Sequence, residues 1–179
     1  MTRERATAAL VALLFGPLAL GACTWIGGIK QSDLTCPAVV PAPGADKIPM
    51  FSPAGHASKD VVVGGRIFDL SAKCEREKVG LAVNAEIVFM AQRATTEIKD
   101  ATLPYFVALV DSQQRVLTEE SFRIVVPFVG GEAERRMPAE KITVHVPVKN
   151  PGMGNAYSVI VGFQLTPDQL AFNRGTLVQ

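Results

Sequence analysis

The chain has 179 residues, of which 48% are hydrophobic and 20% are charged, and its formal net charge at pH 7 is +1. This length suits one domain with a short additional segment. Because the charges are nearly balanced and scattered along the chain, they form no basic surface for nucleic acid, and no nucleic-acid partner is expected.

Residues 1–22 have the pattern of an export signal. Arg3 and Arg5 form a short basic start, and residues 6–22 are almost all apolar or small. The apolar run is short for a membrane-spanning helix, which needs about 20 predominantly apolar residues, and Pro17 interrupts it. We therefore expect a cleaved signal peptide, with a retained N-terminal anchor as the alternative.

The signal ends in "LGAC", residues 20–23. These residues resemble the lipobox of bacterial lipoproteins, in which an apolar residue and two small residues precede a cysteine. The resemblance implies that the mature protein begins at Cys23, that diacylglycerol is attached to its thiol, and that its new amino group is acylated. Two or more acyl chains hold a protein stably on a membrane, so Cys23 is expected to be a lipid anchor. A secretory signal with a chance cysteine is the alternative.

Thr24 follows this cysteine. In enteric bacteria an aspartate at that position keeps lipoproteins in the inner membrane. The resemblance therefore implies a location in the cell envelope, with the periplasmic side of the outer membrane favoured over the inner membrane.

Cys36 and Cys74 are the two cysteines that remain for the rest of the chain. An even number of cysteines in an oxidising compartment favours a disulfide between them. Two free or buried thiols are the alternative. A metal site is disfavoured because the only histidines, His56 and His145, lack any ligand spacing.

Residues 23–58 are expected to form the lipidated cysteine and a proline-rich tether. Proline fixes φ and removes a backbone donor, so this stretch is not expected to form a regular helix or a central strand. Two short segments, "PAVV" and "KIPMF", could still lie along a sheet edge. The prolines of this stretch are Pro37, Pro41, Pro43, Pro49 and Pro53.

Residues 59–179 are expected to form a β domain, because apolar residues alternate with polar ones through much of it. One expected strand, "VGLAVNAEIVFMAQR", places Val79 on the same face as Phe89, and "ITVHVPV" alternates more cleanly. "PYFVALV" is apolar on both faces, which suits a central strand, and a β-bulge is expected at Gly64-Gly65. The other expected strands are "VVVGGRIFDL", "FRIVVPF", "ITVHVPV" and "YSVIVGFQL".

The connections between these strands carry turn residues, and no helical pattern separates them. "DSQQR" joins two apolar runs closely, so it is expected to close a hairpin. Parallel βαβ units are therefore disfavoured, and many antiparallel strands in one modest domain predict a sandwich or a barrel. We expect an all-β, antiparallel immunoglobulin-like β-sandwich with a short C-terminal helix.

The segment "TPDQLAFNRG" predicts that helix. Thr166 is a suitable N-cap, Pro167 suits the first helical position, and Gln169 completes a capping box. Gly175 is expected to end the helix. Leu170 or Phe172 is expected to cover one open end of the sheets.

Two stretches, "PYFVALVD" and "VGFQLTPDQLAFNR", are similar to stretches in uncharacterised envelope lipoproteins of Gram-negative bacteria. The similarity covers the β domain. It implies no activity, because that group has no known activity that could be assigned to these residues.

The sequence assigns no catalytic residue. His145 lies on the polar face of its strand, His56 lies in a loop, and no G-x-S-x-G motif is present. "GMGN" precedes a strand instead of opening a helix, so it is not expected to bind phosphate. The sequence alone brings no two carboxylates together; the candidates are Asp69, Glu86, Asp111, Glu119 and Glu120.

We therefore expect no enzyme and no cofactor, but a membrane-anchored interaction or structural module that binds an envelope protein. A hydrolase or small-ligand-binding lipoprotein with a site on the loops is the alternative, and a deep pocket with convergent polar groups would favour it. The surfaces to test first for a partner are the "NPGMGN" loop, the "GGEAERRMP" loop and the "AFNRGTLVQ" tail with Arg174. For the tail, capping of the sheets is favoured over docking.

Overall fold

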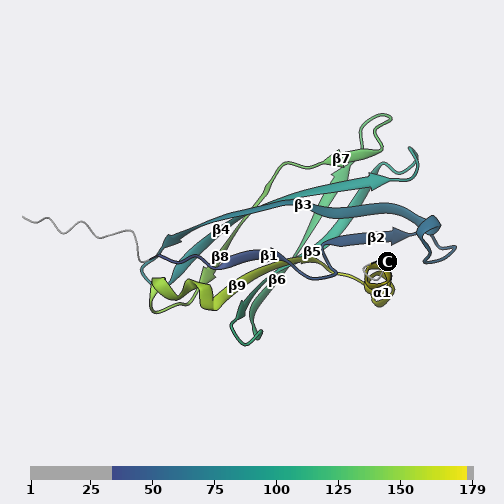
Figure 1. Cartoon of the computed structure of the whole chain (residues 1–179). Coiled ribbons are helices and arrows are strands. Elements are labelled where there is room, and N and C mark those ends of the chain that lie inside the picture. The colour runs from purple at the N-terminus through teal and green to yellow at the C-terminus, as the bar shows by residue number, and fades with distance from the viewer. Residues whose placement is uncertain (1–33, 177–179) are drawn as a thin grey trace, which may run out of the picture. The chain divides into compact units, whose positions relative to one another are not determined.

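A computed structural model describes residues 34–176 of the chain (Figure 1). The predicted signal and Cys23 lie outside the described residues, as do the last three residues of the tail. Residues 34–176 lie within one compact unit. None of the helices in this range has the length and apolar character needed to span a membrane.

The fold consists of two β-sheets and a short C-terminal helix, as the sequence predicted (Figure 1). Sheet A has the strand order β1-β9-β5-β6, and sheet B has the order β2-β3-β4-β7, with β8 also paired to β4. The strands of sheet A are β1 (Ala38–Pro41), β9 (Tyr157–Phe163), β5 (Asp100–Asp111) and β6 (Val116–Pro127). Those of sheet B are β2 (Lys47–Phe51), β3 (Val61–Arg76), β4 (Leu81–Arg93), β7 (Glu134–Arg136) and β8 (Glu140–Val146). The helical segments of the described range are η2 (Ser58–Asp60), η3 (Pro151–Ala156) and α1 (Pro167–Thr176).

Apolar side chains from both sheets form one core, and the alternation in the sequence explains it. In β4, residues 81, 83, 85, 87 and 89 are all buried, as the pattern predicted. Phe89 lies at the centre, with ring centroids 4.7 Å from Tyr105 and 5.7 Å from Phe163. Burial raises the pKa of Tyr105 to about 12. Val79 was predicted on the same face, but it is 83% exposed because it lies in the turn before β4.

The strand pairs are antiparallel, as expected, except that β1 and β9 run parallel. The reason is the path of the chain into β1. The amide of Thr35 donates a hydrogen bond to the carbonyl of Pro151, 3.1 Å away. Both strands therefore start at the same end of the sheet, and no hairpin forces them to run in opposite directions.

Two segments of the proline-rich stretch lie along sheet edges, as their sequence permits. The first, β1, is an edge of sheet A, and the second, β2, is an edge of sheet B. Pro49 within β2 fits this position, because an edge strand has one side without a strand partner. In the described part of this stretch, the chain passes from one sheet to the other.

The β-bulge of β3 is not at Gly64-Gly65, where the sequence predicted it. The register shifts between Ile67 and Asp69 instead. Gly65 has a packing role, because a Cβ there would lie 2.7 Å from Ile48 and 2.9 Å from Leu103. Gly65 therefore reflects close packing against the core, whereas an added Cβ at Gly64 would meet no atom within 4 Å.

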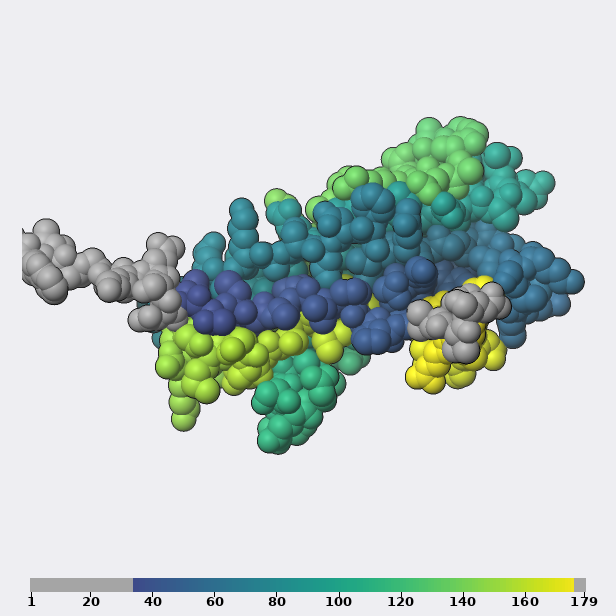
Figure 2. Space-filling view, in the orientation of Figure 1, coloured from purple at the N-terminus to yellow at the C-terminus, as the bar shows by residue number. Residues whose placement is uncertain are grey.

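The β5–β6 hairpin and the capping box of α1 are confirmed. β5 and β6 pair antiparallel across the "DSQQR" turn, and their loop projects from the body of the domain (Figures 1 and 2). The Thr166 amide donates to Gln169 Oε1 at 2.8 Å, and the Gln169 amide donates to Thr166 Oγ1 at 3.3 Å. Gly175 does not end the helix, which continues to Thr176. Helix ends are soft by one or two residues.

Candidate functional site

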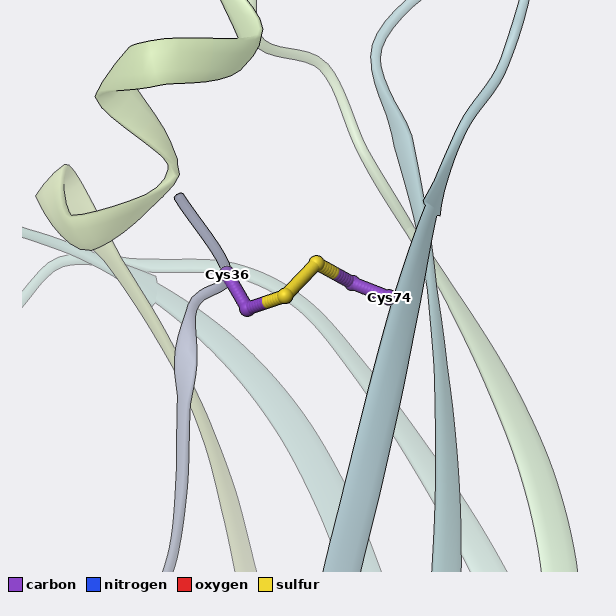
Figure 3. Close-up of a disulfide and its surroundings, with 2 residues drawn as sticks. All are labelled: Cys36 and Cys74. Carbon is purple, nitrogen blue, oxygen red and sulfur yellow. A yellow bond between two sulfur atoms is a disulfide. The ribbon is translucent and has the colours of Figure 1, made fainter. Parts of the chain in front are cut away.

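The structure brings Cys36 and Cys74 to disulfide distance, as the sequence predicted (Figure 3). Their Cα atoms lie 5.7 Å apart. Cys36 lies just before β1 of sheet A, and Cys74 lies in β3 of sheet B. The pair therefore connects the two sheets at the end of the domain where the described chain begins.

The two histidines are surface residues and lie in different places. His145 Nδ1 is 2.9 Å from Glu77 Oε2, and the histidine side chain is 71% exposed. His56 Nδ1 is 3.6 Å from Asp168 Oδ2. Within residues 34–176, no group of three histidine, cysteine or carboxylate residues is arranged to hold a metal ion.

The candidate carboxylates are likewise dispersed. Asp69 accepts a hydrogen bond from the Leu70 amide, and Glu86 lies 3.5 Å from Lys141. Hydrogen bonds from the backbone and side chain of Arg115 lower the pKa of Asp111, which closes the hairpin turn. Glu119 and Glu120 are exposed on β6. Among these described carboxylates, no two form an acid/base pair.

The "GGEAERRMP" loop is fastened to the domain by Arg93, a buried cation that sequence analysis did not identify. Its guanidinium donates to four backbone carbonyls, at distances between 2.6 and 3.2 Å, and stacks over the Phe128 ring at 4.9 Å. The carbonyls belong to Thr96, Ile98, Gly130 and Glu132. These bonds hold the loop in one conformation. The loop is therefore less able to change its conformation to fit a partner, as a docking loop is expected to do.

The tail packs against the domain, which agrees with the capping alternative for its described part. Phe172 contacts Phe51 of β2, with ring centroids 5.3 Å apart. Asn173 Nδ2 donates to the carbonyls of Gly44 and Lys47, at 2.9 and 2.8 Å. Figure 2 shows α1 lying beside the segment that contains β2. Arg174 is exposed on the helix.

The "NPGMGN" loop forms most of η3, with Asn150 as its N-cap, and is held against the start of the described chain. Asn150 Oδ1 accepts a hydrogen bond from the Gly152 amide at 3.0 Å. Gly154 is buried, and a Cβ there would lie 1.8 Å from the carbonyl oxygen of Thr35. Its exposed apolar side chain is Met153. The loop therefore lies close to the disulfide, at the end where β1 begins.

The outer face of sheet A is the surface of this sheet turned away from the core, and its centre is apolar. Phe106 pairs with Gly162, and Ala108 pairs with Ile160, in the two central strands. The Phe106 ring lies over Gly162, since a Cβ on that glycine would come within 2.9 Å of the ring. No side chain of β9 could occupy that space without displacing Phe106.

Exposed apolar residues continue this face to both edges of sheet A. Val40 of β1 is 41% exposed, and Val125 of β6 is 53% exposed. Two charged residues of the face, Glu119 and Arg123, lie on β6 at one edge, and Asp100 lies at the start of β5. The described helix α1 packs against β2. On the outer face of sheet A, Phe106 and Ile160 are partly exposed, whereas Ala108 is buried.

The outer face of sheet B has the opposite character. One row across its strands consists of Lys47, Arg66, Met90 and Arg136, so it holds three cations, with Met90 between the two arginines. None of the three forms a salt bridge with a carboxylate of the described residues. The guanidiniums of Arg66 and Arg136 lie 5.3 and 4.3 Å from the ring of Phe68.

A groove of about 340 Å³ lies next to this row. Its lining includes Gly64, where an added Cβ would meet no atom within 4 Å, and one wall is Phe172 of α1. Lys47, Arg66, Gln92 and Asn173 are the polar residues of its lining. The sequence alone could not reveal this groove, because the row depends on the register of four strands. The apolar outer face of sheet A, by contrast, had a signal in the two-sided apolar pattern of "PYFVALV".

The chain was also compared with known proteins. No protein-family model, no curated protein and no solved structure matched it.

Proposed function

We propose that this chain is an envelope lipoprotein, anchored by lipid on Cys23, whose β domain binds an envelope protein through the outer face of sheet A. The observation that carries this proposal is the apolar centre of that face around Phe106 and Ile160. An accessible apolar patch with a polar rim is typical of protein-binding surfaces. The partner is expected to present an apolar surface of similar size.

The lipid anchor and the fold support the same proposal. Attachment to a membrane raises the concentration of the domain near membrane partners, so a modest affinity is sufficient. We propose that the two sheets form an immunoglobulin-like sandwich, which is supported by the single core that they share. The proposed location is the periplasmic side of the outer membrane, and the absence of enzymatic activity stays a prediction.

The experiment that tests the proposal compares two variants of the full-length lipidated chain. Val40→Lys adds a charge to the outer face of sheet A, and Ser71→Lys adds the same charge to the outer face of sheet B, where Ser71 is exposed. Proteins that copurify with each chain from detergent-solubilised envelopes would be identified. We expect a partner that is recovered with wild type and Ser71→Lys but lost with Val40→Lys. A partner set that is the same for all three chains would contradict the proposal.

A second candidate function is binding of a small anionic ligand in the groove on sheet B. The observation that favours it is the row of cations that form no salt bridge with a described carboxylate, beside the 340 Å³ groove. Its test is the shift in Tm of the full chain on addition of inorganic phosphate or a small carboxylate, compared with Arg66→Gln. A shift that is equal in both chains would remove this candidate.

A further inference from the structure

The strand β6 forms one edge of sheet A, opposite the edge formed by β1. Within the described residues it pairs only with β5, and a cleft of about 130 Å³ lies between it and β8. With 12 residues, β6 is longer than a usual strand, which has about five or six. A long free edge is a template for another strand.

The backbone groups that face this edge can be identified from the register. The Phe128 amide donates to the Lys99 carbonyl at 2.8 Å, which continues the β5–β6 ladder. Residues of an antiparallel pair alternate between hydrogen-bonded and non-hydrogen-bonded positions, so the even-numbered residues of β6 face β5. The odd-numbered residues in the regular part of the strand turn their N–H and C=O groups to the free edge; they are Glu119, Ser121, Arg123 and Val125.

The side chains on these residues are complementary to a second copy of the same strand. In an antiparallel pair with its twofold axis at Ser121, Glu119 lies opposite the partner's Arg123, and this pair occurs twice. Neither Glu119 nor Arg123 forms a salt bridge with another described residue. Opposite charges directly across two strands favour their pairing. Exposed Val125 then lies beside the partner's Leu117, at the bulge where the regular ladder ends.

Neighbouring registers lack this match. An axis at Glu119 or at Arg123 would place two like charges directly opposite each other, which disfavours pairing. If the register of the two β6 strands shifts by one pair in either direction, Glu119 lies opposite the partner's Ser121 or the partner's Val125, which are uncharged. Pro127 limits the edge at one end, because it has no N–H to donate.

We infer that two copies of this chain form a twofold dimer in which their β6 strands pair antiparallel, centred on Ser121. The pairing joins the two copies of sheet A into one continuous sheet. It leaves the apolar outer faces of both copies accessible on the same side, so it is independent of the proposed envelope partner. One feature opposes it: Glu120 lies next to the axis, diagonal to the partner's Glu120 on the inner side of the sheet.

The first test is crosslinking of the full-length lipidated chain in its membrane. Ser121→Cys places one thiol of each copy at the axis, where Cα atoms of a hydrogen-bonded pair are about 5.5 Å apart and a disulfide can form. Ser71→Cys, on the outer face of sheet B, is the matched control. Mild oxidation is expected to give a covalent dimer only for Ser121→Cys. Equal dimer formation by both variants, or a crosslink from Ser121→Cys only to another protein, would overturn the inference.

The second test exchanges the charges and needs no new cysteine. Glu119→Arg or Arg123→Glu alone places like charges opposite each other twice, so each is expected to weaken the dimer about five- to tenfold. The double variant restores opposite charges and is expected to recover the affinity of wild type. Glu120→Gln removes the repulsion at the axis and is expected to strengthen the dimer about threefold.

Sedimentation of the detergent-solubilised full chain would measure these affinities. A wild-type chain that stays monomeric at every concentration would overturn the inference. A double variant that dimerises no more tightly than the two single variants would also overturn it. Circular dichroism of the three variants checks that each is folded, so a weak dimer cannot be attributed to misfolding.

Discussion

The outer faces of the two sheets have different chemistry, although their inner faces share one core. Phe106 and Ile160 occupy the centre of the outer face of sheet A, whereas Lys47, Arg66 and Arg136 form a row on that of sheet B. The core requires apolar residues only on inner faces. Burial in the core therefore does not explain the apolar residues on the outer face of sheet A. Binding of a protein partner would explain them.

The largest expected effect concerns the link that holds both sheets in one domain. Replacing Cys36 and Cys74 by Ser removes a bridge across a sequence separation of 38 residues. Loop-closure entropy predicts a loss of about 4 kcal/mol in the free energy of unfolding. Denaturant unfolding of the two chains measures this loss, and non-reducing peptide mapping of the exported chain should show the linked peptides. Two alkylatable thiols in the wild-type protein would refute the bridge.

The second effect concerns the loop that leads from sheet A into sheet B. Arg93→Ala leaves four carbonyls without their charged donor and opens space beside Phe128. We expect a loss of about 3 kcal/mol in the free energy of unfolding. Arg76→Ala, at an exposed strand end, is the control and should change it by less than about 0.5 kcal/mol. Equal losses in both variants would show that Arg93 does not fasten the loop.

A matched pair of glycines compares the two outer faces directly. A methyl group at Gly162 would collide with Phe106 and Ala42, whereas one at Gly64 meets no atom within 4 Å. Gly162→Ala is therefore expected to cost about 1–3 kcal/mol of unfolding free energy, and Gly64→Ala less than about 0.5 kcal/mol. Thermal unfolding measures both. A harmless Gly162→Ala would mean that the Phe106 ring does not lie over β9.

The smallest effect is the pH dependence of the hairpin turn in sheet A. The pKa of Asp111 is lowered in the folded chain, first by the backbone hydrogen bond from Arg115. A carboxyl group with a lowered pKa stabilises the fold at pH values above its unfolded pKa of about 4, and this contribution is lost as the pH falls through the folded pKa. The difference in unfolding free energy between wild type and Asp111→Asn should therefore shrink below about pH 4. A difference that is constant with pH would contradict this assignment.

Local patterns predicted those parts of the fold that local physics determines. Alternation identified the buried face of β4, and the capping box at Thr166 and Gln169 identified the start of α1. The parallel pairing of β1 with β9 could not be predicted, because it depends on contacts between residues far apart in the sequence. The bulge of β3 was misplaced for a related reason, since Gly65 is explained by its contact with Leu103 of the other sheet.

The candidate surfaces were predictable to different degrees. The two-sided apolar pattern of "PYFVALV" predicted a central strand with apolar residues on both of its faces, and β5 has this position. The cation row on sheet B needs the register of four strands, so no local pattern contains it. The buried role of Arg93 depends on two loops that fold around it.

Two phenylalanines allow the most direct test of the proposed protein-binding face. Phe106 lies on the outer face of sheet A, and Phe68 lies on that of sheet B, where it is 40% exposed. A photoreactive phenylalanine analogue at either position keeps the aromatic shape and captures neighbouring proteins in intact cells. The proposal predicts a specific protein adduct from position 106 and none from position 68. An adduct from position 68 alone, or no adduct from position 106, would contradict it.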